Sequence, residues 1–305
     1  MKIYTCTLNL AIDLFIETDE MVPLKVNRTI DDDIQANGKG INVSLVLNKL
    51  GYQSTALGFK AGFTGQFIED EINQEGIQSN FIEVPGNTRI NVFTKVNNEG
   101  KEYKLVNKGP FVPQKAIRSL LEQIEQIEPG SYLCLSGSFP RGVKPSLLIE
   151  ISEICYQRNI NLIIDNSSAE VIETLPFKPF LVKPNEEEIY EWLGKAIGSI
   201  DDARQQAQKL AELGAQHVLL SLGAKGCVYA SKEKTLFGNS PKGKVINTAC
   251  SGDTLLATFL ANYLSHKSLK DALRESIAAG SSTAFRQGLT DFSDVEELKK
   301  QIKIK

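Results

Sequence analysis

Histidine is scarce in this sequence, since only His217 and His266 occur among its 305 residues. Two histidines are too few for a histidine-rich metal site and leave few candidates for a Ser–His–Asp triad. The five cysteines are widely spaced and form no CxxC pair, which is typical of reduced thiols in a cytosolic protein. The formal net charge of −3 gives no reason to expect nucleic acid or an anionic membrane as a partner.

Long hydrophobic runs are also missing. No apolar stretch is long enough to cross a bilayer, and the first residues, MKIYTCTLNLAID, lack the apolar segment and cleavage site of a signal peptide. No internal repeat, low-complexity segment or Pro/Gly-rich linker divides the chain. We therefore expect a cytoplasmic protein in which residues 1–305 form a single domain.

What the sequence does contain is an alternation of short apolar, β-branched runs with helical patterns. Strands are predicted at 131–137, 161–167, 180–185 and 217–223, and amphipathic helices at 144–159 and 200–215. This alternation predicts a parallel sheet covered by helices on both faces. Ligands of such sheets bind beyond the carboxyl ends of the strands, where this chain places Gly, Ser, Asn and Lys residues.

Two regions depart from this alternation. Residues 11–35 and 88–109 alternate polar and apolar side chains, as a sheet with one solvated face does. The segment VNNEGKEY, 96–103, carries a hairpin turn signal. We expect these regions to form an antiparallel flap built from two excursions out of one domain.

Four stretches combine the residue types that bind phosphate groups. They are QANGKGINVS (35–44), TRINV (88–92), VKPNEEE (182–188) with SLGAKG (221–226), and NTACSGDTLLATFL (247–260). None is a P-loop or a GxGxxG fingerprint. In the last stretch, Asp253 could be an ordinary acid in the first turn of a helix. Alternatively, the free N–H groups of residues 250–253 could form an anion cradle, with Asp253 as the base for a hydroxyl that attacks phosphorus.

Taken in this order, the stretches resemble the motifs of the ribokinase/PfkB family of sugar kinases over essentially the whole chain. NGKGINVS resembles the first family signature, NTACSGDTLLATFL the second, VKPNEEE the Asn-x-x-Glu element and SLGAKG the loop on the nucleotide side. Within the family, TLNLAID, TRINV, SGSFPRG and GFTGQF are most similar to bacterial 1-phosphofructokinases, with tagatose-6-phosphate kinases next.

The resemblance implies a three-layer α/β/α ribokinase-like fold with a mostly parallel central sheet and a small β-sheet lid. It implies an ATP-dependent kinase that uses Mg²⁺ and phosphorylates a ketohexose phosphate, first of all fructose 1-phosphate to fructose 1,6-bisphosphate. A tagatose-6-phosphate kinase and a catalytically weak sugar-phosphate sensor are the alternatives. A homodimer formed through the lid is a further possibility that the resemblance raises.

The resemblance also implies roles for the motif residues. Asp253 would deprotonate the sugar hydroxyl, and the N–H groups of Cys250, Ser251 and Gly252 would hold the phosphoryl group in transfer. The sugar phosphate would be bound by Asp13, Gly38, Lys39, Asn42, Arg89 and Asn91, with Arg28 and Arg141 as candidate second phosphate contacts.

For the nucleotide, the resemblance implies a site lined by Lys183, Ser221, Gly223, Ala224 and Gly226. Asn185 and Glu188 would orient Mg²⁺ through water. The alternative is that these two residues only cap a helix, because their spacing before EIYEWL is that of a capping box. His217 precedes a predicted buried strand, and we expect it to be structural.

Four residues differ from what the family usually has at their positions: Leu10, Asn37, Lys60 and Cys250. We expect Leu10 to alter only the stiffness of its loop, Asn37 and Cys250 to narrow the site, and Lys60 to add a charge to the substrate pocket. A thiol at a helix N-terminus is expected to have a lowered pKa, because the dipole and free N–H groups favour the thiolate. Cys250 is therefore expected to be the most reactive cysteine.

Overall fold

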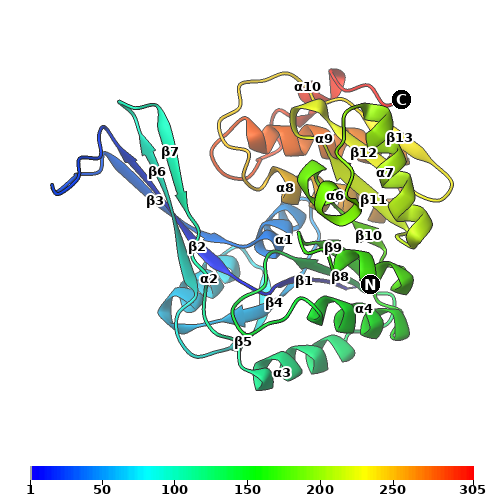
Figure 1. Ribbon diagram of the computed structural model, residues 1–305, viewed down its shortest axis with the longest axis horizontal. Helices are drawn as coiled ribbons and strands as arrows, with labels where there is room; N and C mark the ends of the chain where they lie inside the picture. The colour runs from blue at the N-terminus through cyan, green and yellow to red at the C-terminus, as the bar shows by residue number, and fades with distance from the viewer. Residues whose placement is uncertain (1) are drawn as a thin grey trace.

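The computed structural model describes residues 2–305 and consists of a main body and a projecting lid (Figure 1). The body contains a nine-stranded sheet in the order β13-β12-β11-β10-β9-β8-β1-β4-β5. Its strands are β1 Ile3–Thr7, β4 Thr55–Lys60, β5 Gln78–Glu83, β8 Tyr132–Ser136, β9 Asn161–Asp165, β10 Leu181–Val182, β11 His217–Ser221, β12 Cys227–Ala230 and β13 Thr235–Gly238. The strands from β5 to β11 pair in parallel, whereas β12 and β13 are antiparallel.

Helices cover both faces of this sheet, so the predicted three-layer α/β/α fold is confirmed. They are α1 Lys39–Lys49, α2 Gly62–Gln74, α3 Gln114–Glu125, α4 Leu147–Gln157, α5 Val171–Thr174, α6 Glu186–Leu193, α7 Ile200–Leu213, α8 Ser251–Leu264, α9 Leu269–Ala284 and α10 Val295–Lys300. No helix within residues 2–305 is long and apolar enough to cross a membrane.

The core lies on the two faces of the sheet because alternate side chains of each strand point in opposite directions. On β8, Leu133 and Leu135 pack with α3, α4 and α7, whereas Cys134 between them packs with α1, α8 and α9. The predicted strand at 180–185 is shorter in the structure, where β10 has only two residues. Pro184 has no N–H to donate, which ends the regular ladder there.

The lid is a separate four-stranded sheet in the order β3-β2-β6-β7. Its strands are β2 Ala11–Thr18, β3 Asp31–Asn37, β6 Arg89–Val96 and β7 Lys101–Leu105. The expected flap is present, including the hairpin between β6 and β7, but its central pair, β2 and β6, is parallel and not antiparallel. Both excursions leave the body in the same direction, so their outgoing strands run side by side (Figure 1).

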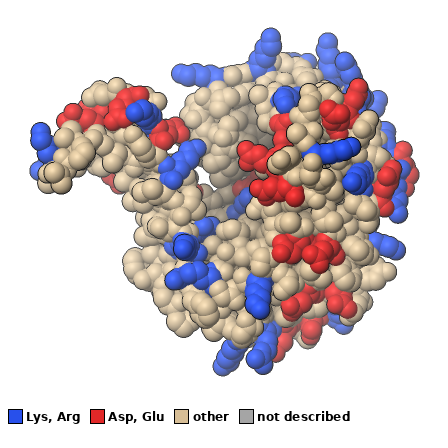
Figure 2. All heavy atoms as spheres, in the orientation of Figure 1, with Lys and Arg blue, Asp and Glu red and all other residues tan. Residues whose placement is uncertain are grey.

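The two faces of the lid differ in character. The face toward the body carries Asp13 and Asn91 near the base and a stacked pair, Phe15 and Phe93, with ring centroids 5.1 Å apart. Acidic side chains also gather on the lid in Figure 2. A cavity of about 250 Å³ between lid and body is lined by this inner face and by Ile246, Asn247, Ala249, Gln287 and Gly288. The lid therefore covers a hollow that opens beside the start of α8.

Candidate active site

The polar residues singled out in the sequence converge at the carboxyl end of the central strands. Lys39 opens α1, Lys183 directly follows β10, and Asp253 lies in the first turn of α8. Helices α1 and α8 pack against each other on one face of the sheet. The chain thus brings together side chains that are more than 200 residues apart in sequence, such as Asn42 and Asp253.

The start of α8 exposes backbone donors. Cys250 precedes the helix in the left-handed conformation, with φ of 62°, and no side chain caps the helix. Within residues 2–305, the amides of Cys250, Gly252 and Asp253 have no protein acceptor, and the amide of Ser251 donates to the Thr248 carbonyl at 3.4 Å. Free amides at a helix N-terminus suit an anion, because the helix dipole also favours negative charge there.

Asp253 is buried beside these amides, with 5% of its surface exposed. Its Oδ2 accepts a hydrogen bond from Asn42 Nδ2 at 2.8 Å. Burial and the charge of Asp165 raise the pKa of Asp253 to about 6, against the opposing effects of Lys39, Asn42 and Lys183. A carboxylate with this pKa is ionised at neutral pH but holds a proton far better than an exposed aspartate does.

Two lysines meet on one carboxylate that was not singled out in the sequence. Asp165, at the end of β9, lies with its Oδ1 3.0 Å from Lys39 Nζ and 3.2 Å from Lys183 Nζ. Burial opposes ionisation of Asp165, but the two ammonium groups outweigh it and hold its pKa below the usual range. The available signal was its position at the end of the strand NLIID, where ligands of parallel sheets bind.

The base of the lid joins the same network. Asp13 on β2 accepts a hydrogen bond from Asn91 Nδ2 at 2.8 Å and another from Asn37. Asn37 Oδ1 accepts a hydrogen bond from Asn42 at 3.0 Å. The departure at Asn37 thus supplies a link between Asp13 in the lid and Asn42, which bonds to Asp253.

Gly38 is required by its surroundings at the start of α1. Its φ is 150°, and a Cβ there would lie 2.7 Å from Thr7 Cγ2. Any other residue would be both strained and crowded. The glycine lets the helix that carries Lys39 and Asn42 begin close to β1.

Arg89 lies at the base of β6, with a polar cluster around it. Its guanidinium donates to the carbonyls of Asn107 at 3.0 Å and Asn9 at 3.1 Å, while its Nε is buried with no partner within residues 2–305. Asn9 Nδ2 in turn donates to Ser138 Oγ at 3.3 Å. Asn9 and Ser138 were not predicted as site residues, and the only signal was their place in TLNLAID and SGSFPRG.

The two candidate second arginines differ in position. Arg141 donates from Nε to the Gly109 carbonyl at 3.0 Å, and Gly109 lies beside Asn9 and Arg89. Arg28 is exposed in the loop between β2 and β3. The structure therefore brings Arg141 to the Arg89 cluster but leaves Arg28 away from it.

The predicted nucleotide side is built around a tight loop after β11. Gly223 and Gly226 have positive φ values of 53° and 121°, and Ala224 lies between them in a short 3₁₀ turn. A Cβ on Gly226 would collide with the Gly238 carbonyl. Ser221 donates from Oγ to the Pro184 carbonyl at 3.3 Å, which ties this loop to the segment that carries Lys183.

Asn185 and Glu188 do form a capping box at the start of α6. Glu188 donates its N–H to Asn185 Oδ1 at 2.8 Å, and Asn185 donates its N–H to Glu188 Oε2 at 2.9 Å. Burial raises the pKa of Glu188, with Lys183 and Lys39 opposing the shift. The cap alternative is thus present in the structure, and it leaves a buried carboxylate near both lysines.

The donor set fits Mg²⁺ carried by a nucleotide. Within residues 2–305, no cluster of three or more His, Cys, Asp or Glu side chains could hold a metal alone. Mg²⁺ usually keeps several waters and binds through one or two carboxylates together with substrate phosphates. A single buried carboxylate such as Glu188 beside an anion cradle matches that mode of binding.

Two predictions about departures from the family are wrong. Lys60 does not add charge to the substrate pocket, because its ammonium pairs with Glu69 and donates to Gln66 at 2.9 Å, both on α2. The pKa of the Cys250 thiol is raised and not lowered, chiefly by burial and then by the negative charges of Asp253 and Asp13. At Cys250 these effects outweigh the helix dipole.

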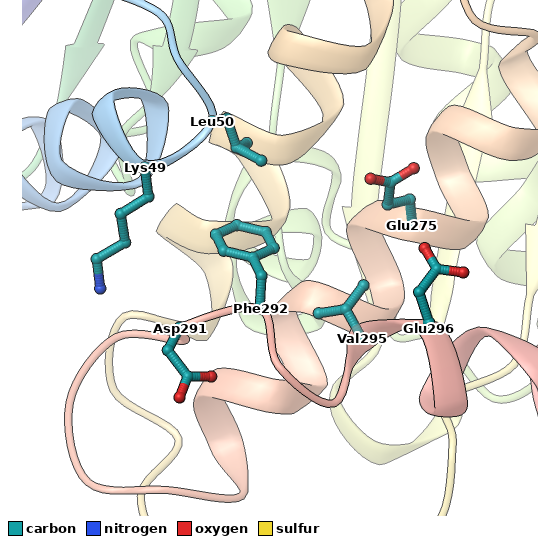
Figure 3. Close-up of a pocket in the computed structure, with 7 residues that line it drawn as sticks. All are labelled: Lys49, Leu50, Glu275, Asp291, Phe292, Val295 and Glu296. Atoms are coloured by element: carbon teal, nitrogen blue, oxygen red, sulfur yellow. The ribbon is translucent and has the colours of Figure 1, made fainter.

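A second cavity, of about 500 Å³, lies away from this site (Figure 3). Leu50, Phe292 and Val295 form its apolar part, with Lys49 on one side and Glu275 and Glu296 on the other. Its charged groups already have partners: Glu275 and Glu296 both pair with Lys299, and Lys49 donates to the Thr290 carbonyl. The candidate active site is therefore the hollow under the lid.

Comparison with known proteins agrees with this fold. The model of the pfkB family of carbohydrate kinases matches residues 5–296. The chain belongs to the pfkB family of carbohydrate kinases and is an ATP-dependent sugar-phosphate kinase that uses Mg²⁺. The family resemblance of the sequence is confirmed.

The similar proteins include kinases of two ketohexose 1-phosphates. A D-tagatose-1-phosphate kinase of Bacillus licheniformis is 45% identical over 303 residues, which are 99% of this chain and 99% of the relative. A 1-phosphofructokinase of Bacillus subtilis is 35% identical over 302 residues, again 99% of each chain. A crystal structure of phosphofructokinase-2 from Escherichia coli in complex with substrates and products has a TM-score of 0.91 and 28% identity, covering 98% of this chain and 99% of that one.

Proposed function

We propose that the protein transfers the terminal phosphoryl group of ATP to the 6-hydroxyl of a ketohexose 1-phosphate, with D-tagatose 1-phosphate as the preferred substrate. The position of the acceptor phosphate is supported by the relatives at 45% and 35% identity, whose names both specify 1-phosphate chemistry. The more similar of them acts on tagatose 1-phosphate, which moves fructose 1-phosphate, the first expectation from the sequence, to second place.

The observation that carries the proposal is Asp253 beside the free amides of α8. With a pKa of about 6, Asp253 is mostly ionised at neutral pH and can accept a proton from a hydroxyl. The hydroxyl oxygen then forms its bond to the γ-phosphorus as the bond to the leaving ADP oxygen breaks. The proton of the hydroxyl remains on Asp253 until it passes to solvent.

The surrounding donors stabilise the charge on the phosphoryl group during this step. The amides of residues 250–252 and the ammonium groups of Lys39 and Lys183 present positive charge to a phosphoryl group at the start of α8, and such preorganised donors are a major source of rate enhancement. Bound Mg²⁺ would be held through Glu188 and water and would neutralise charge on the phosphates. Asn185 orients Glu188 through the capping box.

The two substrates enter from different sides of this centre. Asp13 and Asn91, at the base of the lid, are assigned to the sugar hydroxyls, and Gly38 and Asn42 lie beside them. Arg89 is assigned to the phosphate at the far end of the sugar, because an arginine fork matches phosphate geometry and its Nε is still unpaired. The loop of Ser221, Gly223, Ala224 and Gly226 is assigned to the nucleotide together with Lys183.

We further propose that the protein forms a homodimer through the outer face of the lid. The side chains of Leu14 and Ile34 pair across β2 and β3, and those of Val92 and Leu105 pair across β6 and β7, all on the face opposite Phe15. Ile34 is 50% exposed and Leu105 is 64% exposed. A sheet with an apolar face left open to solvent is typical of an interaction surface.

The function is tested by ATP consumption with fructose 1-phosphate, tagatose 1-phosphate, tagatose 6-phosphate and fructose 6-phosphate. We expect the highest kcat/KM with tagatose 1-phosphate, followed by fructose 1-phosphate, which differs from it only in configuration at C4. A preference for either 6-phosphate would contradict the proposal that the substrate carries its phosphate on C1 and is phosphorylated at the 6-hydroxyl. A mock purification without the protein is the control for contaminating kinases.

The dimer is tested by sedimentation of the protein and of an Ile34→Asp/Leu105→Asp variant. We expect a dimer for the unmodified chain and a monomer for the variant, because charges on this face must be desolvated on association. An unchanged mass for the variant would place the interface elsewhere.

A further inference from the structure

Asp165 is a fully buried carboxylate, at 0% exposure, that no motif of the sequence singles out. One of its oxygens, Oδ1, faces the ammonium groups of both Lys39 and Lys183, at 3.0 Å and 3.2 Å. The two lysines come from different elements, because Lys39 opens α1 and Lys183 follows β10. Asp165 therefore fixes the relative position of two cations that the backbone alone does not join.

Asp253 does not share these lysines. Its hydrogen-bond partner is the neutral amide of Asn42, and no ion pair joins it to a lysine within residues 2–305. Lys183 instead lies against the start of α8, where a Cβ on Gly252 would come within 3.1 Å of its Nζ. Lys183 thus lies at the anion cradle, while Asp253 beside it stays free of an ion pair.

This separation needs a cause, because unlike charges in a buried site attract strongly. At a distance of 4 Å and an effective dielectric constant of 20, the attraction is about 4 kcal/mol. A lysine paired with Asp253 would stabilise its anion and make it a poorer base. Both lysines instead lie within 3.2 Å of the Asp165 carboxylate.

We propose that Asp165 is a positioning residue that holds Lys39 and Lys183 at the phosphoryl site and away from Asp253. The inference rests on the proposed function, since it takes Asp253 as the base. It assigns different roles to two buried aspartates: Asp165 binds the two lysines, and Asp253 accepts the proton.

The test is the variant Asp165→Asn, which removes the charge and keeps the size of the side chain. Two effects then act on Asp253 in the same direction: the repulsion from Asp165 is lost, and the released lysines can pair with Asp253. We expect the acid limb of kcat against pH to move down by about one pH unit, the size of shift that one nearby charge causes. The maximal kcat should fall by roughly 10-fold or more, because the cations are misplaced.

A second readout needs no turnover. The carboxyl ¹³C signal of Asp253, assigned by its loss in Asp253→Asn, reports the titration of this group in the free protein. It should move to lower pH in Asp165→Asn. The matched control is Asp201→Asn at the exposed start of α7, which should leave both the titration and kcat unchanged.

A variant at a partly exposed position guards against misfolding of Asp165→Asn. The side chain of Lys39 is 39% exposed, and Lys39→Met removes a cation that lowers the pKa of Asp253. The titration of Asp253 should therefore move to higher pH in this variant, opposite to the shift in Asp165→Asn.

The outcomes separate this inference from the proposed function. If Asp165→Asn loses activity while the acid limb and the ¹³C titration stay in place, Asp165 serves only the fold and the inference is overturned. An unmoved titration in Lys39→Met overturns it as well. If Asp253→Asn keeps a near-normal kcat, the proposed function itself fails, whatever Asp165 does.

Discussion

Asn42 Nδ2 lies 2.8 Å from Asp253 Oδ2 and 3.0 Å from Asn37 Oδ1, so one amide group contacts both the buried carboxylate and the base of the lid. Because Asn37 also donates to Asp13, hydrogen bonds run without a break from the lid to the first turn of α8. A sugar bound at Asp13 would thereby be connected to the group that we assign as its base. The contact between Asn42 and Asp253 cannot be read from the sequence, since the two residues are 211 positions apart.

The first prediction concerns Asp253 as the general base. Asp253→Asn should lower kcat by roughly 10²–10⁴-fold, the usual contribution of a general base, and leave the KM for ATP nearly unchanged. In the unmodified protein, kcat should fall as the pH drops through about 6, because the proton acceptor is then protonated. A kcat–pH profile of both proteins measures this, and an Asn variant with near-normal kcat rules out the role.

The second prediction concerns Arg89. Arg89→Ala should weaken sugar-phosphate binding by about 1.5–3 kcal/mol, the range for a hydrogen bond to a charged group. Isothermal titration with the sugar phosphate measures the loss. The control is an analogue without the phosphate, for which the loss should be much smaller. Equal losses for both ligands would show that Arg89 serves the lid, where it already binds the carbonyls of Asn9 and Asn107.

The third prediction concerns stability and His217. This side chain donates to or accepts from Tyr229 Oη at 2.8 Å and packs among Phe180 and Tyr263, and burial lowers its pKa to about 4. The unfolded chain binds a proton near pH 6.5 and the folded chain only near pH 4. This group therefore contributes stability above pH 6.5 that is lost as the pH falls to 4, by up to about 3 kcal/mol.

Urea unfolding at pH 7 and pH 4.5 measures this contribution. His217→Gln should lose less stability between the two pH values than the unmodified protein, although it is less stable at pH 7. His266→Gln, at an exposed position after α8, is the control and should behave like the unmodified protein. The same pH dependence in His217→Gln would assign the acid loss to other groups.

Much of the fold was predictable because the signals are local. The strands at 131–137, 161–167 and 217–223 stand out as short β-branched runs, and each is present in the structure. The parallel pairing of β2 with β6 could not be predicted in the same way. It depends on how two excursions, far apart in sequence, leave the body side by side.

In the site, too, local patterns were predictable and long-range contacts were not. Motif residues such as Lys39 and Asp253 carry a pattern of small neighbours that points to phosphate chemistry, and the structure brings them together. Asp165 carries no such pattern, because its importance comes from Lys39, 126 residues away, and from Lys183, which directly follows the neighbouring strand β10. Likewise, the helix N-terminus predicts a reactive Cys250, but desolvation depends on tertiary packing and reverses the sign of the pKa shift.

The last prediction follows from that reversal. The pKa of Cys250 is raised, so the thiolate is scarce near neutral pH and alkylation should be slow. In a mass-spectrometric time course at pH 7 we expect Cys250 to label no faster than Cys134, which is fully buried in β8 and whose pKa is raised to about 12. Rapid labelling that Mg-ATP blocks would restore the idea of a thiolate in the active site.

Cys250→Gly is the companion variant to this labelling experiment. Glycine adopts a φ of 62° without strain and keeps the amide, so kcat should be kept or raised if the backbone holds the phosphoryl group. A large fall in kcat would instead show that the side chain takes part, through its contact with Asn42 at 3.2 Å.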